Sequence, residues 1–292
     1  MFPDRVAALV EERRSQIVLG LDPDPSRLWP VAVGAESVGE AVGAHCRAAI
    51  EATASACVAV KLQLACFERL GAYGWTALEE IVAAAREHGL FVLADGKRGD
   101  VPVTAHAYAQ ALVGETPTPF GPVAGLGADA FTANPLLGRD SLEPLIEAAD
   151  ASAAGCFVLV RTSNPGAADV QDLVGPAGPV HESLARIVAE LGAGRTGSCG
   201  LSNVGAVTGA TRPELLARLR ELMPQTIFLL PGVGAQGGAV EDLAAAFRPH
   251  PAAGLIAASR SIVNAAGEGE DHAHAAAAAA EEMRRAAWAL AC

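Results

Sequence analysis

Short apolar segments alternate with longer amphipathic segments along most of this chain. The apolar segments have strand length and are continuously hydrophobic, which is typical of parallel strands buried on both faces. The segments between them place apolar residues three or four positions apart, as in a helix with one buried face. The predicted strands cover residues 16–21, 58–64, 91–94, 128–132, 156–161, 198–204, 226–230 and 253–258. The predicted helices cover residues 5–14, 38–56, 74–88, 100–113, 141–152, 180–191, 213–222, 240–247 and 272–290.

Eight strands alternating with helices predict an α/β fold, a (β/α)8 TIM barrel formed as a single domain over residues 1–292. The competing arrangement is an open doubly wound sheet, whose glycine-rich loop normally follows the first strand. Here the glycine-rich loop 231–238 follows the seventh strand and Arg260 follows the eighth, which is the usual phosphate position of barrels. We therefore expect a barrel, with the first helix closing one end and loop 114–127 as the place for an insertion.

The composition is that of a globular protein, with 51% hydrophobic and 18% charged residues. A net charge of −12 argues against a nucleic-acid or anionic-membrane surface, so any anionic ligand must be bound by local positive charge. No segment is apolar for the length of a membrane span. The six cysteines lack CxxC spacing, which indicates neither a zinc site nor a disulfide framework and fits a cytoplasmic location.

The third predicted strand ends in a cluster of charged residues, Asp95-Gly-Lys97-Arg-Gly-Asp100. Asp95 and Lys97 are two positions apart, so in an extended chain both side chains leave the same face. Removing an acid and an amine from water at the edge of a core is costly without a partner or a task, which indicates a functional site. Asp100 precedes Pro102 at an expected helix start, so its carboxylate has an equally good interpretation as a helix cap.

Lys61 lies inside the second apolar strand, which leaves three interpretations. It is a Schiff-base amine with a pKa lowered by burial, a lysine kept charged by carboxylates, or a lysine that extends its ammonium group to solvent. Asp22, Asp95 and Asp100 all follow predicted strands. This favours the second interpretation, in which acids and lysines alternate at one end of the barrel.

The glycine-rich loop PGVGAQGG contains Gly232, Gly234, Gly237 and Gly238. Glycines let the backbone approach a ligand closely, and the start of the following predicted helix attracts an anion. Arg260 can bind the same anion with two parallel hydrogen bonds. We therefore expect a phosphate site here. Ser163, which follows the fifth strand, can hydrogen-bond a polar ring or simply form a turn.

The motifs together resemble those of the orotidine 5′-phosphate decarboxylase family. The sequence ADGKRGD resembles the family signature DxKxxD, and KRGDVPVTAHAYA, TSNPGA and PGVGAQGG resemble its bacterial subgroup with longer chains. The resemblance covers nearly the whole barrel, in family order. It implies a cytoplasmic enzyme that converts orotidine 5′-phosphate to uridine 5′-phosphate and CO₂, the last step of pyrimidine nucleotide synthesis, without a cofactor or metal.

The resemblance also implies roles for individual residues. Lys97 would protonate C6 of the pyrimidine, and Asp95 would lie beside the substrate carboxylate. Lys61 and Asp22 would bind the ribose hydroxyls and complete the charge network. Within the DxKxxD signature, Gly96 replaces the alanine that is usual in the family.

The same resemblance assigns the remaining contacts. Ser163 would contact the pyrimidine, while Gln236 and Arg260 would hold the phosphate. Asp100 and Thr104 would reach into the site of a second subunit, which implies a homodimer with shared active sites.

Two other functions remain open from the sequence. A metal-dependent sugar-phosphate decarboxylase or aldolase on the same barrel would need a further carboxylate, and only Glu51 and Glu68 lie near the second strand. A catalytically silent nucleotide-binding barrel would not need the acids and lysine of the DxKxxD pattern.

Overall fold

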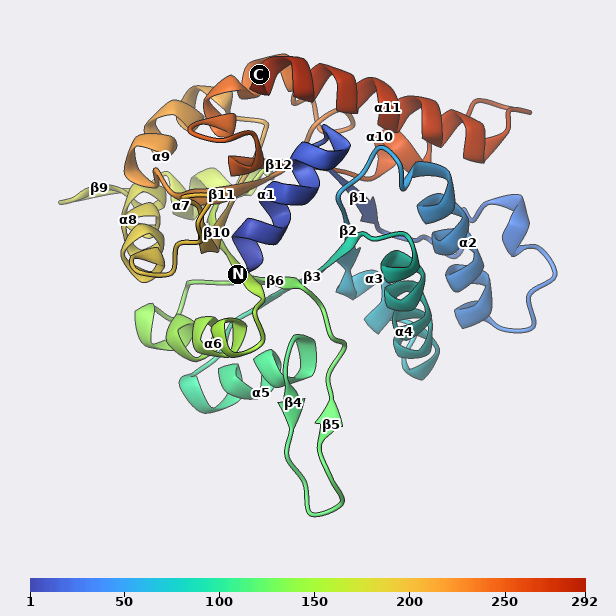
Figure 1. The fold of residues 1–292 in the computed structure, drawn as a ribbon, viewed down its shortest axis with the longest axis horizontal. Helices are drawn as coiled ribbons and strands as arrows, with labels where there is room; N and C mark the ends of the chain where they lie inside the picture. The colour runs from blue at the N-terminus through green and yellow to red at the C-terminus, as the bar shows by residue number, and fades with distance from the viewer.

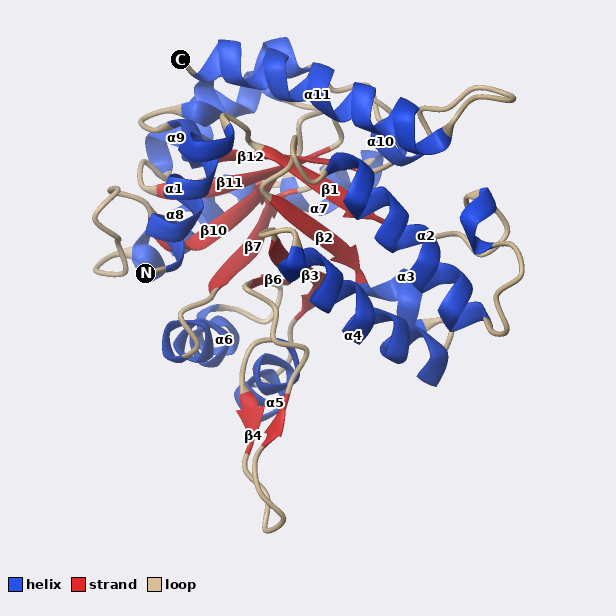
Figure 2. Cartoon of the chain, turned by 45° about the vertical axis from the view of Figure 1, so that its right-hand side comes forward, coloured by secondary structure: helices blue, strands red, loops and turns tan.

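Eight parallel strands close into a barrel in the computed structural model of the chain, which describes residues 1–292. The barrel strands are β1 (Ile17–Leu21), β2 (Ala59–Gln63), β3 (Phe91–Arg98), β6 (Ala130–Ala133), β7 (Gly155–Arg161), β10 (Ser202–Thr208), β11 (Thr226–Pro231) and β12 (Gly254–Ala258). They pair in chain order, and β12 closes the barrel by pairing with β1, with Ile256 opposite Ile17. Figure 2 shows the strands surrounded by helices. The predicted (β/α)8 class is confirmed.

The helices fill the connections between the strands and cover the outside of the barrel (Figure 1). The α-helices are α1 (Phe2–Arg13), α2 (Val38–Thr53), α3 (Leu64–Glu68), α4 (Ala72–Glu87), α5 (Pro102–Leu112), α6 (Arg139–Ala151), α7 (Ala168–Gln171), α8 (Val180–Gly192), α9 (Leu216–Leu222), α10 (Arg260–Val263) and α11 (His272–Ala291). The 3₁₀ helices are η1 (Pro30–Ala32), η2 (Pro165–Ala167), η3 (Pro213–Leu215), η4 (Val240–Phe247) and η5 (Pro251–Ala253). None of the helices combines the length and the hydropathy that a membrane crossing requires.

Local sequence explains where α2 and α11 begin. The hydroxyl of Ser37 accepts the N–H of Glu40 and caps α2, and the carboxylate of Asp271 accepts two N–H groups at the start of α11. Each cap satisfies backbone donors that have no partner inside the helix. The caps fix the entry of the chain into the two helices, which pack against each other on the outside of the barrel.

Two hydrophobic clusters hold the barrel together. A cluster of 62 buried residues joins the strands to the surrounding helices, and a cluster of 18 lies inside the barrel. Helix α1 completes the inner cluster, with the ring of Phe2 packed edge-on against Phe157 at 6.3 Å between centroids. The predicted closure of one end by the first helix is therefore confirmed (Figure 1). Functional residues are left to the opposite end, where the strands have their carboxyl termini.

Three predicted elements differ most in the structure. The third strand, expected at residues 91–94, is β3 and continues to Arg98. The sixth barrel strand, expected at residues 198–204, is β10 and begins four residues later, at Ser202. Within this strand Gly205 lies against Phe157, where an added Cβ would come within 2.4 Å of the ring. The segment at residues 240–247 is helical as expected, but it is the 3₁₀ helix η4.

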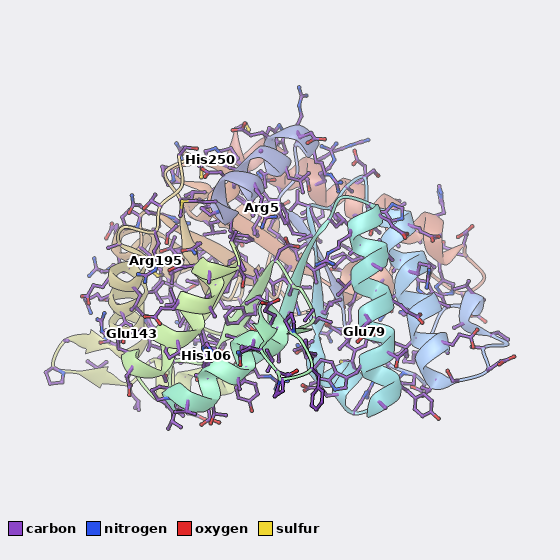
Figure 3. The ribbon with its side chains drawn as sticks, turned by 60° about the horizontal axis from the view of Figure 1, so that its bottom comes forward. Arg5, Glu79, His106, Glu143, Arg195 and His250 are labelled. Atoms are coloured by element: carbon purple, nitrogen blue, oxygen red, sulfur yellow. The ribbon has the colours of Figure 1, made fainter.

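Two small hairpins extend from the barrel. Loop 114–127 contains β4 (Glu115–Thr116) paired with β5 (Val123–Ala124), and this hairpin projects from the body beside α5 (Figure 1). A second hairpin, β8 (Val174–Gly175) with β9 (Gly178–Pro179), precedes α8. On the outside of the barrel, Glu79 on α4 and His106 on α5 are exposed (Figure 3).

Candidate active site

A pocket of about 540 Å³ lies at the carboxyl ends of the barrel strands. Residues at or just beyond the ends of β1, β2, β3, β7, β11 and β12 contribute to its lining. Eight predicted site residues line it: Asp22, Lys61, Asp95, Lys97, Ser163, Gly232, Gln236 and Arg260. The barrel therefore brings together residues that are far apart in the chain, as expected for a site at this end of the fold.

Four charged side chains form an alternating row along one side of the pocket. The Lys61 ammonium lies 2.7 Å from one carboxylate oxygen of Asp95 and 3.7 Å from Asp22. The Lys97 ammonium lies 2.7 Å from the other carboxylate oxygen of Asp95. The order along the row is therefore Asp22, Lys61, Asp95 and Lys97, so adjacent charges have opposite signs. The predicted meeting of Asp95 and Lys97 on one face is confirmed.

Asp95 is buried at the centre of this row and accepts hydrogen bonds from four side chains. Besides the two lysines, these are the Gln63 amide at 3.4 Å and the Thr132 hydroxyl at 2.9 Å. Burial raises the pKa of a carboxyl, but here Lys61 and Lys97 outweigh it and lower the pKa of Asp95 to about 2. Asp95 is therefore ionised throughout the physiological pH range.

Lys61 is held as a cation by the same contacts. Its burial alone would lower the pKa of its ammonium, but Asp95 and then Asp22 raise it above the ordinary value. The structure thus supports the interpretation of Lys61 as a charged member of a network. A Schiff-base role would require a lysine with a lowered pKa.

The backbone at Lys97 has an unusual conformation that directs its side chain. Its φ of 49° lies in the left-handed region, which residues other than glycine rarely adopt. The pairing of β3 with β6 shifts register between Ala94 and Arg98, and the N–H of Lys97 donates to the Thr132 hydroxyl at 2.8 Å instead. The Lys97 side chain remains 42% exposed, so its ammonium faces the open pocket.

The opposite side of the pocket contains the glycine-rich loop and Arg260. Gly232 has a φ of 103°, and an added Cβ there would lie 3.2 Å from Ser163, so only glycine fits. Gln236 and Arg260 are exposed toward the pocket, and Ser259 and Ser261 add hydroxyl groups beside them.

This side of the pocket differs from the expectation in two respects. Gly234 and Gly237 lie in the loop but do not line the pocket. The element after the loop is helical as expected, but it is the 3₁₀ helix η4. The short helix α10 begins instead at Arg260, directly after β12, and its first two residues line the pocket.

Asp100 and Thr104 lie outside the pocket of their own chain. Asp100 is not the cap of α5, because the N-cap is Val101, whose N–H donates to the Asp100 carboxylate at 2.7 Å. Pro102 occupies the first turn as expected. Asp100 is thus not a member of the row of charges within one chain, and Thr104 is exposed.

The two acids considered as metal ligands also lie elsewhere. Glu68 forms an ion pair with Arg98, and Glu51 is exposed on α2. Neither residue lines the pocket. The carboxylate of Asp95 is fully used by the donors described above.

Several pocket residues were not expected from the sequence. Thr132 supports both Asp95 and Lys97, and Gln63 bonds Asp95. Gln171 lies beside Thr162 on the wall formed after β7. The sequence could have indicated Gln63 and Thr132 as pocket residues, since both lie near the ends of predicted strands. Gln171 carries no such signal, because it is brought back to the pocket by a loop.

The fold and the pocket define this protein as a (β/α)8 barrel with a site of alternating carboxylate and ammonium groups at the carboxyl ends of its strands. Comparison with known proteins narrows this class. Residues 15–276 match the sequence model of the orotidine 5′-phosphate decarboxylase / HUMPS family. The chain belongs to this family.

Individual relatives agree with this assignment. Orotidine 5′-phosphate decarboxylase of Rhodopirellula baltica is 42% identical over 90% of this chain and 88% of its own length. The Deinococcus radiodurans enzyme of the same name is 42% identical over 91% of this chain and 90% of its own. Among solved structures, a putative orotidine 5′-phosphate decarboxylase from Streptomyces avermitilis has a TM-score of 0.82 at 33% identity, covering 99% of this chain and 95% of that one.

Proposed function

We propose that this protein decarboxylates orotidine 5′-phosphate to uridine 5′-phosphate and CO₂. The observation that carries the proposal is the row of Asp22, Lys61, Asp95 and Lys97 at the end of the barrel. Two relatives that match about 90% of this chain are both named orotidine 5′-phosphate decarboxylase, which supports the same reaction.

Lys97 is the proposed proton donor. Loss of CO₂ leaves an electron pair on C6 of the pyrimidine, and a fixed ammonium group beside that carbon stabilises the developing negative charge. The same ammonium then transfers a proton to C6, which completes the product. Asp95 holds Lys97 at 2.7 Å, so the cation is in place before the substrate reacts. Repulsion between Asp95 and the substrate carboxylate adds a smaller contribution.

The other pocket residues are proposed to bind the parts of the substrate that do not react. Asp22 and Lys61 would bind the ribose hydroxyls, and Ser163 would bind the pyrimidine. Gln236 and Arg260 would bind the phosphate. All five residues line the same pocket. Binding energy from the phosphate and ribose can then be used to hold the pyrimidine against Lys97.

Ultraviolet absorbance of orotidine 5′-phosphate tests the reaction. The protein should convert it to uridine 5′-phosphate at the same rate with and without EDTA. Lys97→Ala should lower turnover by about 10³-fold or more, because both the charge and the proton are lost. Glu79→Gln, on the outer surface of α4, is the matched control and should retain full turnover. Near-normal turnover of the Lys97 variant would overturn its role, and loss of activity in EDTA would favour a metal-dependent reaction.

We further propose a homodimer in which Asp100 and Thr104 enter the pocket of the partner subunit. Both residues lie at the start of α5, outside their own pocket. Beside them Val101 is 52% exposed and Val103 is 85% exposed, which leaves apolar surface for a second copy to cover.

Mixing two inactive variants tests this dimer. Lys97→Ala and Asp100→Ala should each have low activity alone. In a mixed dimer one pocket carries both changes and the other carries neither, so re-equilibrated equal mixtures should recover about a quarter of wild-type activity. A monomer in light scattering, or no recovery on mixing, would contradict the shared site. The proposal also places the enzyme in the cytosol, where its six free cysteines stay reduced.

A further inference from the structure

One wall of the pocket is a segment that leaves the barrel and returns to it. Segment 162–171 follows β7 and contains η2 and α7. Seven of the 25 residues that line the pocket come from this segment, including Ser163 and Gln171. We call residues 162–171 the β7 wall. Its position therefore sets the shape of a large part of the pocket.

Hydrophobic packing holds the β7 wall only weakly. Ala167 is its one buried residue, and Val170 is 52% exposed. A segment with so little buried apolar surface depends on polar contacts for a fixed position. The contacts that tie its two ends to the barrel, together with the Thr211 hydroxyl that donates to the Ser163 carbonyl at 3.2 Å, therefore decide how firmly it is held.

An ion pair joins the residues that flank the β7 wall. Arg161, the last residue of β7, is 4% exposed, and its guanidinium donates two parallel hydrogen bonds to Asp172, at 2.8 and 3.0 Å. This two-bond geometry fixes direction as well as distance. The hydrogen bonds from Arg161 lower the pKa of the Asp172 carboxyl, which keeps it ionised.

Further contacts hold the two ends of the β7 wall together. The Gln171 side chain accepts the N–H of Thr162 at 2.8 Å and donates to the Thr162 hydroxyl at 3.0 Å. The Nδ1 of His181, on α8, lies 3.2 Å from the Asp172 carboxylate and 2.9 Å from the Gln171 carbonyl. The end of the wall is thus attached both to β7 and to the helix that follows.

We propose that Arg161 and Asp172 form a clasp that positions the β7 wall against the pyrimidine ring of the substrate. This inference rests on the proposed function, because that proposal places the pyrimidine beside Ser163. Neither the Asp172 side chain nor that of Arg161 lines the main pocket, so both act through the wall and are positioning residues. The proposed ribose and phosphate contacts come from residues outside the β7 wall, at the ends of β1, β2, β11 and β12.

Binding of two ligands to purified full-length variants separates this role from a general structural one. Uridine 5′-phosphate contains the pyrimidine, whereas ribose 5-phosphate lacks it. Asp172→Ala should weaken uridine 5′-phosphate binding by about tenfold and lower kcat/KM for orotidine 5′-phosphate by a similar factor. Ribose 5-phosphate affinity should change by less than about twofold, and Asp172→Glu, which retains the charge, should recover part of the loss.

Asp150→Ala provides the matched control. It removes the pair of Asp150 with Arg195, 2.7 Å apart and outside the pocket lining, and should leave both affinities unchanged. If Asp172→Ala does not fold, Asp172→Asn, which keeps the size of the side chain, replaces it and should show the same selective loss.

Unchanged uridine 5′-phosphate affinity, or equal losses for both ligands, would overturn the clasp. A wild-type protein that binds uridine 5′-phosphate without turnover would overturn the proposed reaction but not the clasp. A wild-type protein that does not bind uridine 5′-phosphate would overturn both.

Discussion

Replacing Asp95 by asparagine tests whether the row of charges stabilises the fold as well as the reaction. The change keeps the size of the side chain but removes the negative charge between the two lysines. The ammonium of Lys61 is then left buried, with Asp22 as its remaining partner at 3.7 Å. Breaking a buried ion pair in this way costs about 3–5 kcal/mol, so we expect Asp95→Asn to lower the free energy of unfolding at pH 7.

The pKa of Asp95 gives the part of this cost that depends on pH. That pKa is lowered from 3.8 to about 2 in the folded protein. A lowered carboxyl pKa stabilises the folded state above the unfolded-state pKa, and the stabilisation is lost as the pH falls through the folded-state pKa. The shift corresponds to about 2 kcal/mol at pH 7, of which about half should be lost by pH 3 and most by pH 2.

Urea unfolding of wild type and Asp95→Asn at pH 7, 5 and 3 measures this effect. The difference in unfolding free energy between the two proteins should shrink by about 1 kcal/mol from pH 7 to pH 3. Other carboxyl groups titrate in both proteins and cancel in the difference. Glu79→Gln, at an exposed site (Figure 3), should follow wild type at every pH. A difference that does not vary with pH, or a variant more stable than wild type, would refute the reasoning.

Two further predictions concern residues that support the site and the barrel. Thr132→Val removes the hydroxyl that accepts the N–H of Lys97 and donates to Asp95. The kcat should therefore fall by about 10- to 100-fold, while the affinity for uridine 5′-phosphate changes little. An unchanged kcat would show that this support is dispensable. Arg220→Met removes a buried guanidinium that donates to four backbone carbonyls and stacks on Phe228 at 3.7 Å. Unfolding free energy by urea titration should fall by about 3–4 kcal/mol with turnover per folded molecule retained, and a loss below 1 kcal/mol would contradict this.

Most of the barrel could be predicted from the sequence because buried parallel strands are continuously apolar and end in polar residues. The third strand shows this clearly, since its apolar residues and the acid and lysine two positions apart fixed both the strand and the face of the site. The sixth strand could not be placed in the same way. Small and polar residues interrupt its hydrophobic pattern, and Gly205 lies where an added Cβ would meet Phe157 of the neighbouring strand, a contact that no local pattern reveals.

The individual members of the site were also partly visible in the sequence. Asp95 and Lys97 follow from local spacing, and the family motifs identify Asp22, Lys61 and Arg260. Local spacing left Asp100 with two interpretations, a helix cap or a functional carboxylate, and only the family resemblance assigned it to the site of a second subunit; in the structure it lies outside the pocket of its own chain. It also gave no indication that Gln171 returns to the pocket.

The sequence by itself therefore determined the type of fold, the strand ends that carry chemistry and the charges available there. The tertiary structure decided which of these charges lie within contact distance. Asp95 meets Lys61 because β2 pairs with β3 in a register that places Gln63 opposite Asp95, and it meets Thr132 because β6 pairs on the other side. The pKa of Asp95 depends on these neighbours, since burial and charge act through space and not along the chain.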